Sequence, residues 1–155
     1  MNLVSDAEIL LVEDDPVDAE LILTALKTSC PGATINALPD GVEAIDYLFA
    51  RGSFAHRSPE STPKVIFLDL KLPKVNGLEV LQRIRQDSRT RAIPVVMFSS
   101  SRELSDIQTC YRLGANSYVV KPVDAEHFIK TIAEMGNYWV HINEISHTVL
   151  LKFSE

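Results

Sequence analysis

Acidic, hydroxyl and basic side chains follow four apolar runs of the sequence, at the point where each run ends. Glu13 and Asp14 follow the first of these runs, Asp69 a second, and Ser99 and Lys121 the last two. Carboxylates held close together repel one another and need a cation. Ligation by oxygen alone favours a hard ion such as Mg²⁺ or Mn²⁺. These residue types therefore predict a magnesium site, provided that the four run ends meet.

Asp69 is the residue to which this chemistry points most directly. A carboxylate can attack phosphorus as a nucleophile and give an acyl phosphate. A metal ion and Lys121 would stabilise the charge on the transferring group, and the Ser99 hydroxyl would donate to one of its oxygens. We therefore predict that Asp69 accepts a phosphoryl group.

Each of these residues also has a simpler interpretation when taken alone. An acid after a strand, such as Asp15, most often caps a helix. Lys121 followed by Pro122 is typical of a surface turn, and the serines at 99–101 are suited to a helix start. The combination favours the functional interpretation, because each group falls at the same end of a different run.

Five apolar runs predict the strands that position these residues. Four of them are nearly continuous and rich in β-branched residues, which is typical of strands buried on both faces. The run at 34–38 is weaker and more alternating, and we expect it at an edge of the sheet. The runs span residues 9–12, 34–38, 65–68, 95–98 and 118–120.

Helical patterns separate these runs and complete the predicted fold class. Strands that alternate with single helices indicate an α/β fold, with a doubly wound five-stranded parallel sheet. Such sheets carry their functional loops at the carboxyl ends of the strands. The stretch 51–64 is polar and reads as an exposed loop. The helices are expected over 17–28, 41–50, 77–86 and 105–113, and from 125 onward, where Phe128, Ile129, Ile132 and Met135 form one apolar stripe.

Composition excludes several classes of protein. The 155 residues suit one ordinary domain, with 46% hydrophobic and 23% charged residues and a net charge of −6. That charge argues against nucleic acid or an anionic membrane as the main partner. No apolar run approaches a membrane span and no signal peptide is recognisable, so we expect a cytoplasmic protein. Cys30 and Cys110 sit in no metal-binding motif and are expected to be free thiols.

Four segments of the chain resemble the receiver domain of bacterial two-component response regulators. The resemblance implies a flavodoxin-like (βα)₅ fold with strand order 2-1-3-4-5, over a core of about 8–134 within a single domain of 1–155. Only about twenty residues follow this core, too few for an output domain, so none is expected. The matching segments are ILLVEDDP at 9–16, VIFLDLKLPKVNG at 65–77, IPVVMFSSS at 93–101 and GANSYVVKP at 114–122.

The resemblance assigns the metal and phosphoryl roles residue by residue. It makes Asp69 the phosphorylation site, with a histidine kinase as the donor. Glu13 and Asp14 match the acidic pair that binds Mg²⁺ together with Asp69. The backbone carbonyl of Lys71 is the further expected ligand. The Lys71 side chain, together with Ser101, is also placed to influence the lifetime of the acyl phosphate.

The resemblance also implies a switch. Ser99 contacts the phosphoryl group, Lys121 pairs with the phosphorylated aspartate, and the Lys121–Pro122 bond is expected to be cis. Tyr118 matches the aromatic position whose ring moves inward when Ser99 moves toward the phosphate. Serine stands where threonine is commoner, which removes a methyl group and predicts a softer coupling to Tyr118.

The chain also resembles a narrower subgroup, the single-domain regulators that partner cyanobacterial and bacterial phytochromes. The resemblance lies in the last twenty residues, the loop at 51–64 and the LDLKLPKVNG motif at 68–77. Members of that subgroup form homodimers through the last helix and its neighbours. We therefore expect Tyr138 and Trp139 to contribute to a dimer interface, the simpler alternative being that they pack on their own domain. Residues 149–151 would form an added strand or remain disordered.

Three other functions compete with a phosphorylated switch. A phosphohydrolase of the haloacid dehalogenase type needs a second aspartate two residues after the nucleophile, where this chain has Lys71. A flavodoxin-like electron carrier needs a phosphate-binding loop after the first strand, where Glu13 and Asp14 would repel phosphate. A pseudo-receiver that never becomes phosphorylated would not need the complete set of acidic, hydroxyl and lysine side chains.

Overall fold

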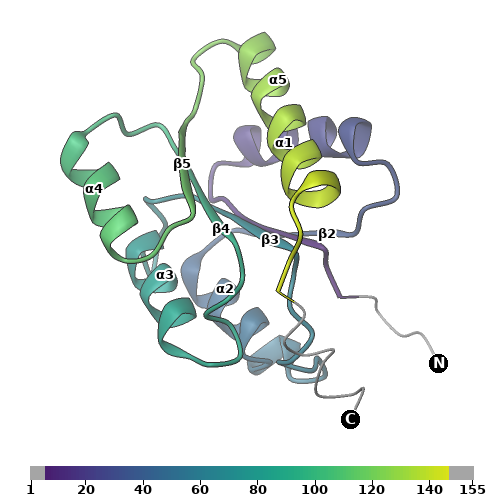
Figure 1. The fold of residues 1–155 in the computed structure, drawn as a ribbon, viewed down its shortest axis with the longest axis vertical. Coiled ribbons are helices and arrows are strands. Elements are labelled where there is room, and N and C mark those ends of the chain that lie inside the picture. Colours follow the sequence, from purple (N-terminus) through teal and green to yellow (C-terminus); the bar gives the residue numbers. More distant parts are fainter. Residues whose placement is uncertain (1–5, 147–155) are drawn as a thin grey trace.

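A single parallel sheet organises the molecule, as the computed structural model shows for residues 6–146 (Figure 1). Its strand order is β2-β1-β3-β4-β5, which confirms the fold class predicted from the sequence. The weak run at 34–38 becomes β2 and lies at an edge, as expected. The strands are β1 (Ile9–Val12), β2 (Ile35–Leu38), β3 (Val65–Leu68), β4 (Val95–Ser99) and β5 (Ser117–Val120).

Five α-helices follow the strands, and four of them begin at a side-chain cap. Asp15 accepts hydrogen bonds from the backbone N–H groups of Val17 and Asp18, and Pro16 occupies the first turn. Asp40, Asn76 and Asp124 cap three other helices in the same way. The helices are α1 (Pro16–Ser29), α2 (Gly41–Leu48), α3 (Gly77–Gln86), α4 (Leu104–Arg112) and α5 (Ala125–Gly136), with short helical turns at Gly52–Phe54 and Asn137–Ile142.

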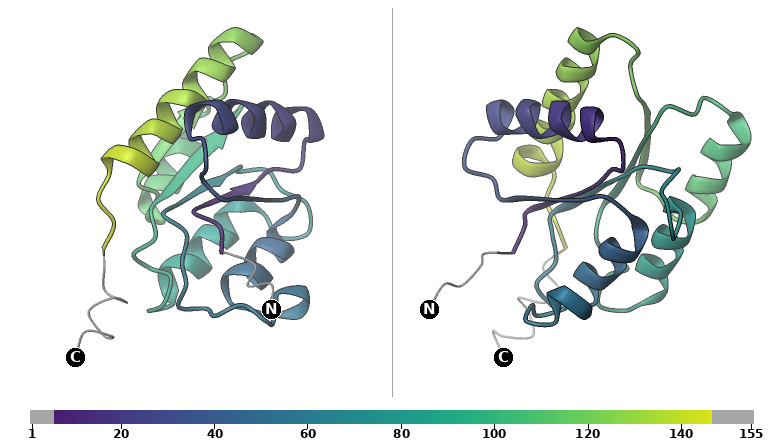
Figure 2. Two further views of the ribbon diagram at one scale, coloured as in Figure 1. Left: turned by 90° about the vertical axis from the view of Figure 1, so that its right-hand side faces the viewer. Right: turned by 180° about the vertical axis from the view of Figure 1, so that it is seen from behind.

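The helices cover both faces of the sheet (Figure 2). Helices α1 and α5 pack on one face, where Ile9, Leu11 and Phe67 point, and the others lie on the opposite face with Leu10 and Val12. Alternate residues of one strand thus enter different cores, which is why the central strands read as continuous apolar runs. Within residues 6–146, no helix is long and apolar enough to cross a membrane.

Two details of the sequence prediction are wrong. Strand β5 is only half-buried, because it forms the second edge of the sheet and has a strand neighbour on one side only. Ile129 does not join the buried stripe of α5. It is 41% exposed, whereas Phe128, Ile132 and Met135 are buried against the sheet and α1. The expectation for 149–151 lies outside the described residues.

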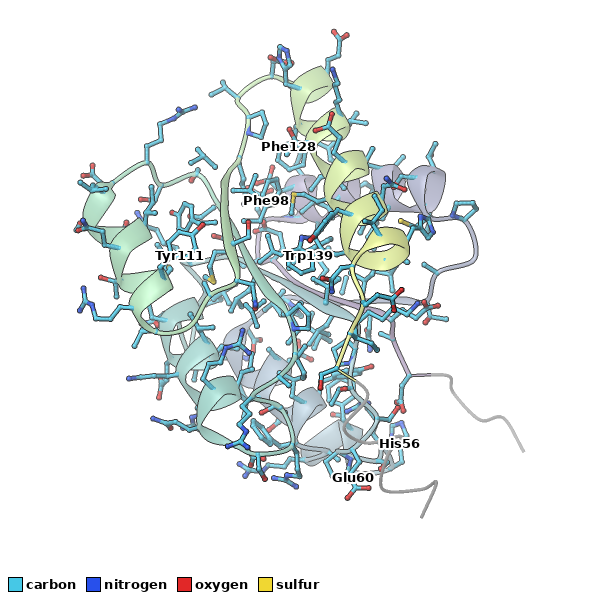
Figure 3. All side chains as sticks on the ribbon, viewed as in Figure 1. His56, Glu60, Phe98, Tyr111, Phe128 and Trp139 are labelled. Carbon is cyan, nitrogen blue, oxygen red and sulfur yellow. The ribbon has the colours of Figure 1, made fainter. Side chains whose placement is uncertain are left out.

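The end of α5 continues into a π-helical turn, Asn137–Ile142. Trp139 is half-buried and packs against the core on the α1–α5 face, as Figure 3 shows. Tyr138 meets the Trp139 ring edge-on, with 4.9 Å between the ring centroids, but is 46% exposed. The two aromatic residues therefore differ: Trp139 stabilises its own domain, whereas Tyr138 presents a free surface.

Candidate functional site

The carboxyl ends of β1, β3, β4 and β5 bring the predicted residues together. Ladder hydrogen bonds continue one residue past the strands, since the Asp69 N–H donates to Val12 and the Lys121 N–H donates to Ser99. The backbones of Asp69 and Lys121 are therefore held by the hydrogen bonds of the sheet itself. Asp69 and Lys121 are buried, at 8% and 9% exposure, so their side chains interact in a place largely closed to water.

The loop after Asp69 owes its path to a glycine. A Cβ atom on Gly77 would lie 2.2 Å from the backbone oxygen of Asp69, far inside van der Waals contact. The Gly77 N–H also donates to the carbonyl oxygen of Leu70 at 2.9 Å. The aspartate and glycine of the DLKLPKVNG segment are therefore spaced so that the start of α3 packs directly on the loop that carries Asp69.

The Lys121 ammonium lies at the centre of the site. Its Nζ donates to Glu13 Oε1 at 2.5 Å, to Asp18 Oδ2 at 2.9 Å and to Asp69 Oδ2 at 3.0 Å. Ammonium carries three protons, and each of them has a carboxylate acceptor. Lys121 thus joins the ends of β1 and β3 with the first turn of α1.

Charge is unbalanced in this cluster, because several carboxylates share one ammonium. Burial raises the pKa of Glu13 to about 7, although its hydrogen bond with Lys121 opposes that rise. Burial by itself would lower the pKa of Lys121, but its hydrogen bonds with Glu13 and Asp18 outweigh it, so that this pKa is raised. Lys121 is therefore held as a cation, and the surplus negative charge is available to a further cation.

The acidic residues have the right donors for that cation. One carboxylate oxygen from each of Glu13, Asp14 and Asp69 lies within 4.8 Å of the other two. Asp14 is exposed, which leaves one side of the cluster open to water, as a hydrated Mg²⁺ requires. The residues therefore fit a hard divalent ion. The backbone carbonyl of Lys71 remains a predicted ligand. The backbone N–H of the same residue donates to Asp69 Oδ1, with 3.4 Å between nitrogen and oxygen.

Ser99 and Tyr118 are linked through Ser101, which lies in the loop between β4 and α4. Ser99 is 1% exposed, and its Oγ accepts a hydrogen bond from the Ser101 N–H at 3.2 Å. The Tyr118 hydroxyl donates to the Ser101 carbonyl at 2.9 Å. Burial raises the pKa of Tyr118 against opposing hydrogen bonds with Ser99 and Ser101. The predicted switch residues are therefore in one hydrogen-bonded chain.

Two site residues were missed by sequence reasoning. Asp18 contacts Lys121 from the first turn of α1, and Asp106 of α4 accepts a hydrogen bond from Ser101 Oγ at 2.6 Å. The position of Asp18, three residues after the Asp15 cap, was the available signal, since a helix that starts at this edge directs its first turn toward the site. The expected cis bond at Lys121–Pro122 is wrong: within residues 6–146 every peptide bond is trans.

Comparison with known families decides the class of this protein. The family model described as response regulator receiver domain matches residues 9–133 of this chain. The chain belongs to the response regulator receiver family. As a receiver domain it is a component of two-component signalling, and the predicted resemblance is confirmed. The family carries no assigned enzyme class.

Two curated relatives span most of this receiver domain. The probable methanogenesis regulatory protein FilR2 of Methanothrix harundinacea is 39% identical over 135 residues, covering 87% of this chain and 84% of its own. Response regulator Rcp1 of Synechocystis sp. is 36% identical over 132 residues, covering 85% and 88%. A solved structure of the Mn²⁺-bound form of Rcp1 superposes with a TM-score of 0.83 at 33% identity over 89% of this chain and 97% of that one. That relative thus binds Mn²⁺, and Glu13, Asp14 and Asp69 offer the oxygen ligands that such a hard ion prefers, which confirms the predicted type of ion.

Two further solved structures connect this receiver domain with phytochrome regulators. The phosphorylated cyanobacterial phytochrome response regulator RcpA has a TM-score of 0.84 at 34% identity, over 91% of this chain and 99% of that one. The bacteriophytochrome response regulator RtBRR is 49% identical, with a TM-score of 0.70, over 94% and 87%. The receiver domain is therefore homologous to phytochrome-associated regulators, and the narrower resemblance seen in the sequence is confirmed.

Proposed function

We propose that Asp69 accepts a phosphoryl group from a histidine kinase and that this modification switches the interactions of the protein. The observation that carries the proposal is the position of Asp69 itself. Its carboxylate lies 3.0 Å from the Lys121 ammonium and within 4.8 Å of ligand oxygens from Glu13 and Asp14. A nucleophile, a fixed cation and a set of hard ligands thus share one sheet edge.

The transfer is a displacement at phosphorus. An Asp69 oxygen forms a bond to the phosphorus of phosphohistidine while the P–N bond breaks, and the leaving imidazole takes up a proton from water. Lys121 already donates to Asp69, so it neutralises charge on the incoming phosphoryl oxygens without moving far. Ser99 donates its hydroxyl proton to a phosphoryl oxygen, and its Oγ thereby moves away from the Ser101 N–H, from which it accepts in this structure. When bound, Mg²⁺ would supply further neutralisation of phosphoryl charge, held by Glu13, Asp14, Asp69 and the Lys71 carbonyl.

The proposed phosphodonor is a phytochrome-type sensor kinase. The support is the homology with RcpA and with RtBRR, the latter at 49% identity. Phosphotransfer from a purified phytochrome kinase, measured against a non-phytochrome kinase at equal concentration, tests this part. Equal rates from both donors would contradict it.

Output in this proposal passes through Ser99, Ser101 and Tyr118 to α4. Moving Ser99 Oγ toward a phosphoryl group releases the Ser101 N–H, and Ser101 in turn holds Tyr118 and Asp106. The receiver domain signals to a partner or to a second copy of itself, in the cytoplasm and without binding nucleic acid or membrane. The exposed Tyr138, next to Trp139, supports the homodimer.

Turnover of phosphoesters is not part of this proposal. Lys71 stands at the position where an aspartyl phosphohydrolase needs an acid, so the only reactions proposed are self-phosphorylation and self-dephosphorylation. A scaffold that is never phosphorylated would not explain why three carboxylates, one of them that of Asp69, converge on the Lys121 ammonium.

The test is incubation with Mg²⁺ and acetyl phosphate, followed by intact-protein mass spectrometry. We expect one base-labile phosphoryl adduct in the wild-type protein and none in Asp69→Asn. Absence of an adduct in the wild-type protein would favour the scaffold. Sustained release of phosphate from small phosphoesters would favour the hydrolase.

A further inference from the structure

Asp18 is an acidic residue of the site that lies outside the metal cluster. Its Oδ2 is 2.9 Å from Lys121 Nζ, and its side chain is 28% exposed. The three residues whose oxygens cluster for a metal are Glu13, Asp14 and Asp69, and Asp18 is not among them. Asp18 therefore contacts the Lys121 ammonium but is not one of the three candidate metal ligands.

The position of Asp18 is fixed by the start of α1. The Asp18 N–H donates to Asp15 Oδ1 at 3.1 Å, so the capping residue that starts the helix also sets the direction of the first turn. Helix α1 packs closely along α5, where a Cβ atom on Gly136 would lie 2.8 Å from Leu26 Cδ2. Because α5 follows Lys121 along the chain, the distance between Asp18 and Lys121 is set by two packed helices.

The three acceptors of Lys121 have different roles once the site is in use. Glu13 and Asp69 have other proposed partners, the divalent ion for both and the phosphoryl group for Asp69. Their hydrogen bonds to Lys121 are then weakened or replaced. Asp18 has no such competing partner, and its bond to Lys121 is charge-assisted.

We propose that Asp18 is a positioning residue for phosphorylation, which holds the Lys121 ammonium at the centre of the site while Glu13 and Asp69 change partners. Without this anchor, the long lysine side chain regains rotamers that point elsewhere. Asp18 acts only through Lys121. The inference rests on the proposed function, because Asp69 must be the acceptor.

The first experiment reads Lys121 directly, at saturating Mg²⁺ and without a phosphoryl donor, so that the ion competes with Lys121 for Glu13 and Asp69. The ¹H–¹⁵N signal of a lysine ammonium is observed only when hydrogen bonds and burial slow its proton exchange, and Lys121→Arg assigns it by its loss. We expect the signal in the wild-type protein, its loss or severe broadening in Asp18→Ala, and its retention in Glu20→Ala. Glu20 is an exposed acid on the same helix and is the matched charge control. An unchanged signal in Asp18→Ala would overturn the proposal.

The second experiment measures the rate of phosphorylation by acetyl phosphate as a double-mutant cycle. At saturating Mg²⁺, Asp18→Ala should lower the rate roughly tenfold, the scale of one charge-assisted hydrogen bond, whereas Glu20→Ala should stay near the wild-type rate. In a Lys121→Ala background, the Asp18→Ala change should lower the phosphorylation rate by less than about twofold, because Asp18 acts only through Lys121. A tenfold loss in both backgrounds, or an equal loss in Glu20→Ala, would overturn the role assigned to Asp18.

Two safeguards keep the outcomes separate. Asp18→Asn keeps the size of the side chain and is measured in the same way, should the alanine variant be unstable. If the wild-type protein takes up no phosphoryl group at Asp69, the proposed function fails, while the ammonium signal still tests the contact between Asp18 and Lys121.

Discussion

The Tyr118 hydroxyl donates a hydrogen bond to the backbone carbonyl of Ser101, with 2.9 Å between the oxygens. Ser101 in turn donates its N–H to Ser99 Oγ. A side chain on β5 is thus held by the backbone of the β4–α4 loop, and that loop is held by the buried hydroxyl of Ser99. Any movement of Ser99 changes the support of the tyrosine ring.

Removing the Tyr118 hydroxyl should therefore loosen the loop. We expect Tyr118→Phe to lower the free energy of unfolding by about 1 kcal/mol, because the Ser101 carbonyl loses a partner in a half-buried place. Urea denaturation measures this change. Tyr138→Phe is the matched control and should have no effect, since Tyr138 is exposed. Equal losses in both variants would contradict the coupling.

Gly77 should tolerate no side chain. A methyl group there would meet the Asp69 carbonyl oxygen at 2.2 Å, so Gly77→Ala must push the start of α3 away from the site. We expect a loss of at least about 2 kcal/mol in unfolding free energy and slower phosphorylation of Asp69. Glu79→Ala, on the exposed side of the same helix, should cost less than about 1 kcal/mol. A Gly77→Ala protein of wild-type stability would disprove the close contact.

Stability should fall with rising pH when no divalent ion is present. The pKa of Glu13 is about 7 in the folded protein against 4.5 in an unfolded chain, so between these values only the folded state keeps the proton. The free energy of unfolding should thus decrease from pH 4.5 through pH 7. Mg²⁺ binds ionised carboxylates, so it should raise Tm more at pH 8 than at pH 5.

The control for this pH dependence is Glu13→Gln, which cannot ionise. Its unfolding free energy should decrease less steeply with rising pH than that of the wild-type protein. Mg²⁺ should also stabilise the variant less than it stabilises the wild-type protein. Thermal unfolding across this pH range, with EDTA or Mg²⁺, supplies both measurements. An identical slope in the two proteins would show that another group titrates.

Lys71 should prolong the life of the acyl phosphate. Its side chain is exposed beside the site, and its N–H lies 3.4 Å from Asp69 Oδ1. With Lys71→Ala, water reaches the phosphorylated aspartate more freely, and we expect dephosphorylation to accelerate about threefold, a barrier change of about 0.7 kcal/mol. Lys74→Ala is the control, because Lys74 pairs with Asp40 instead. An unchanged rate in Lys71→Ala would exclude this role.

Substitutions at Tyr138 and Trp139 should distinguish self-association of the protein from the stability of its monomer. Tyr138→Ala should weaken the dimer in sedimentation while leaving the monomer's unfolding free energy nearly unchanged, because the ring is exposed. Trp139→Ala should weaken the dimer and also cost about 2 kcal/mol of monomer stability, since Trp139 packs on its own core. A wild-type protein that stays monomeric at high micromolar concentration would exclude the interface.

The sequence by itself determined the parallel sheet and the identity of the main site residues. Apolar runs made the strands recognisable, and the parallel arrangement then required Glu13, Asp69, Ser99 and Lys121 to meet, because carboxyl ends of parallel strands share one edge. Local caps such as Asp15 and Asp40 were also readable, since they depend on residues close in the chain.

Only the tertiary structure decided which side chains touch across elements. The contact of Asp18 with Lys121 joins residues 103 positions apart, and it depends on how α1 packs against α5. The half-burial of β5, the exposure of Ile129 and the contrast between Trp139 and Tyr138 likewise depend on which neighbours each element finds. Periodicity specifies a face of a helix or strand, whereas packing decides what that face meets.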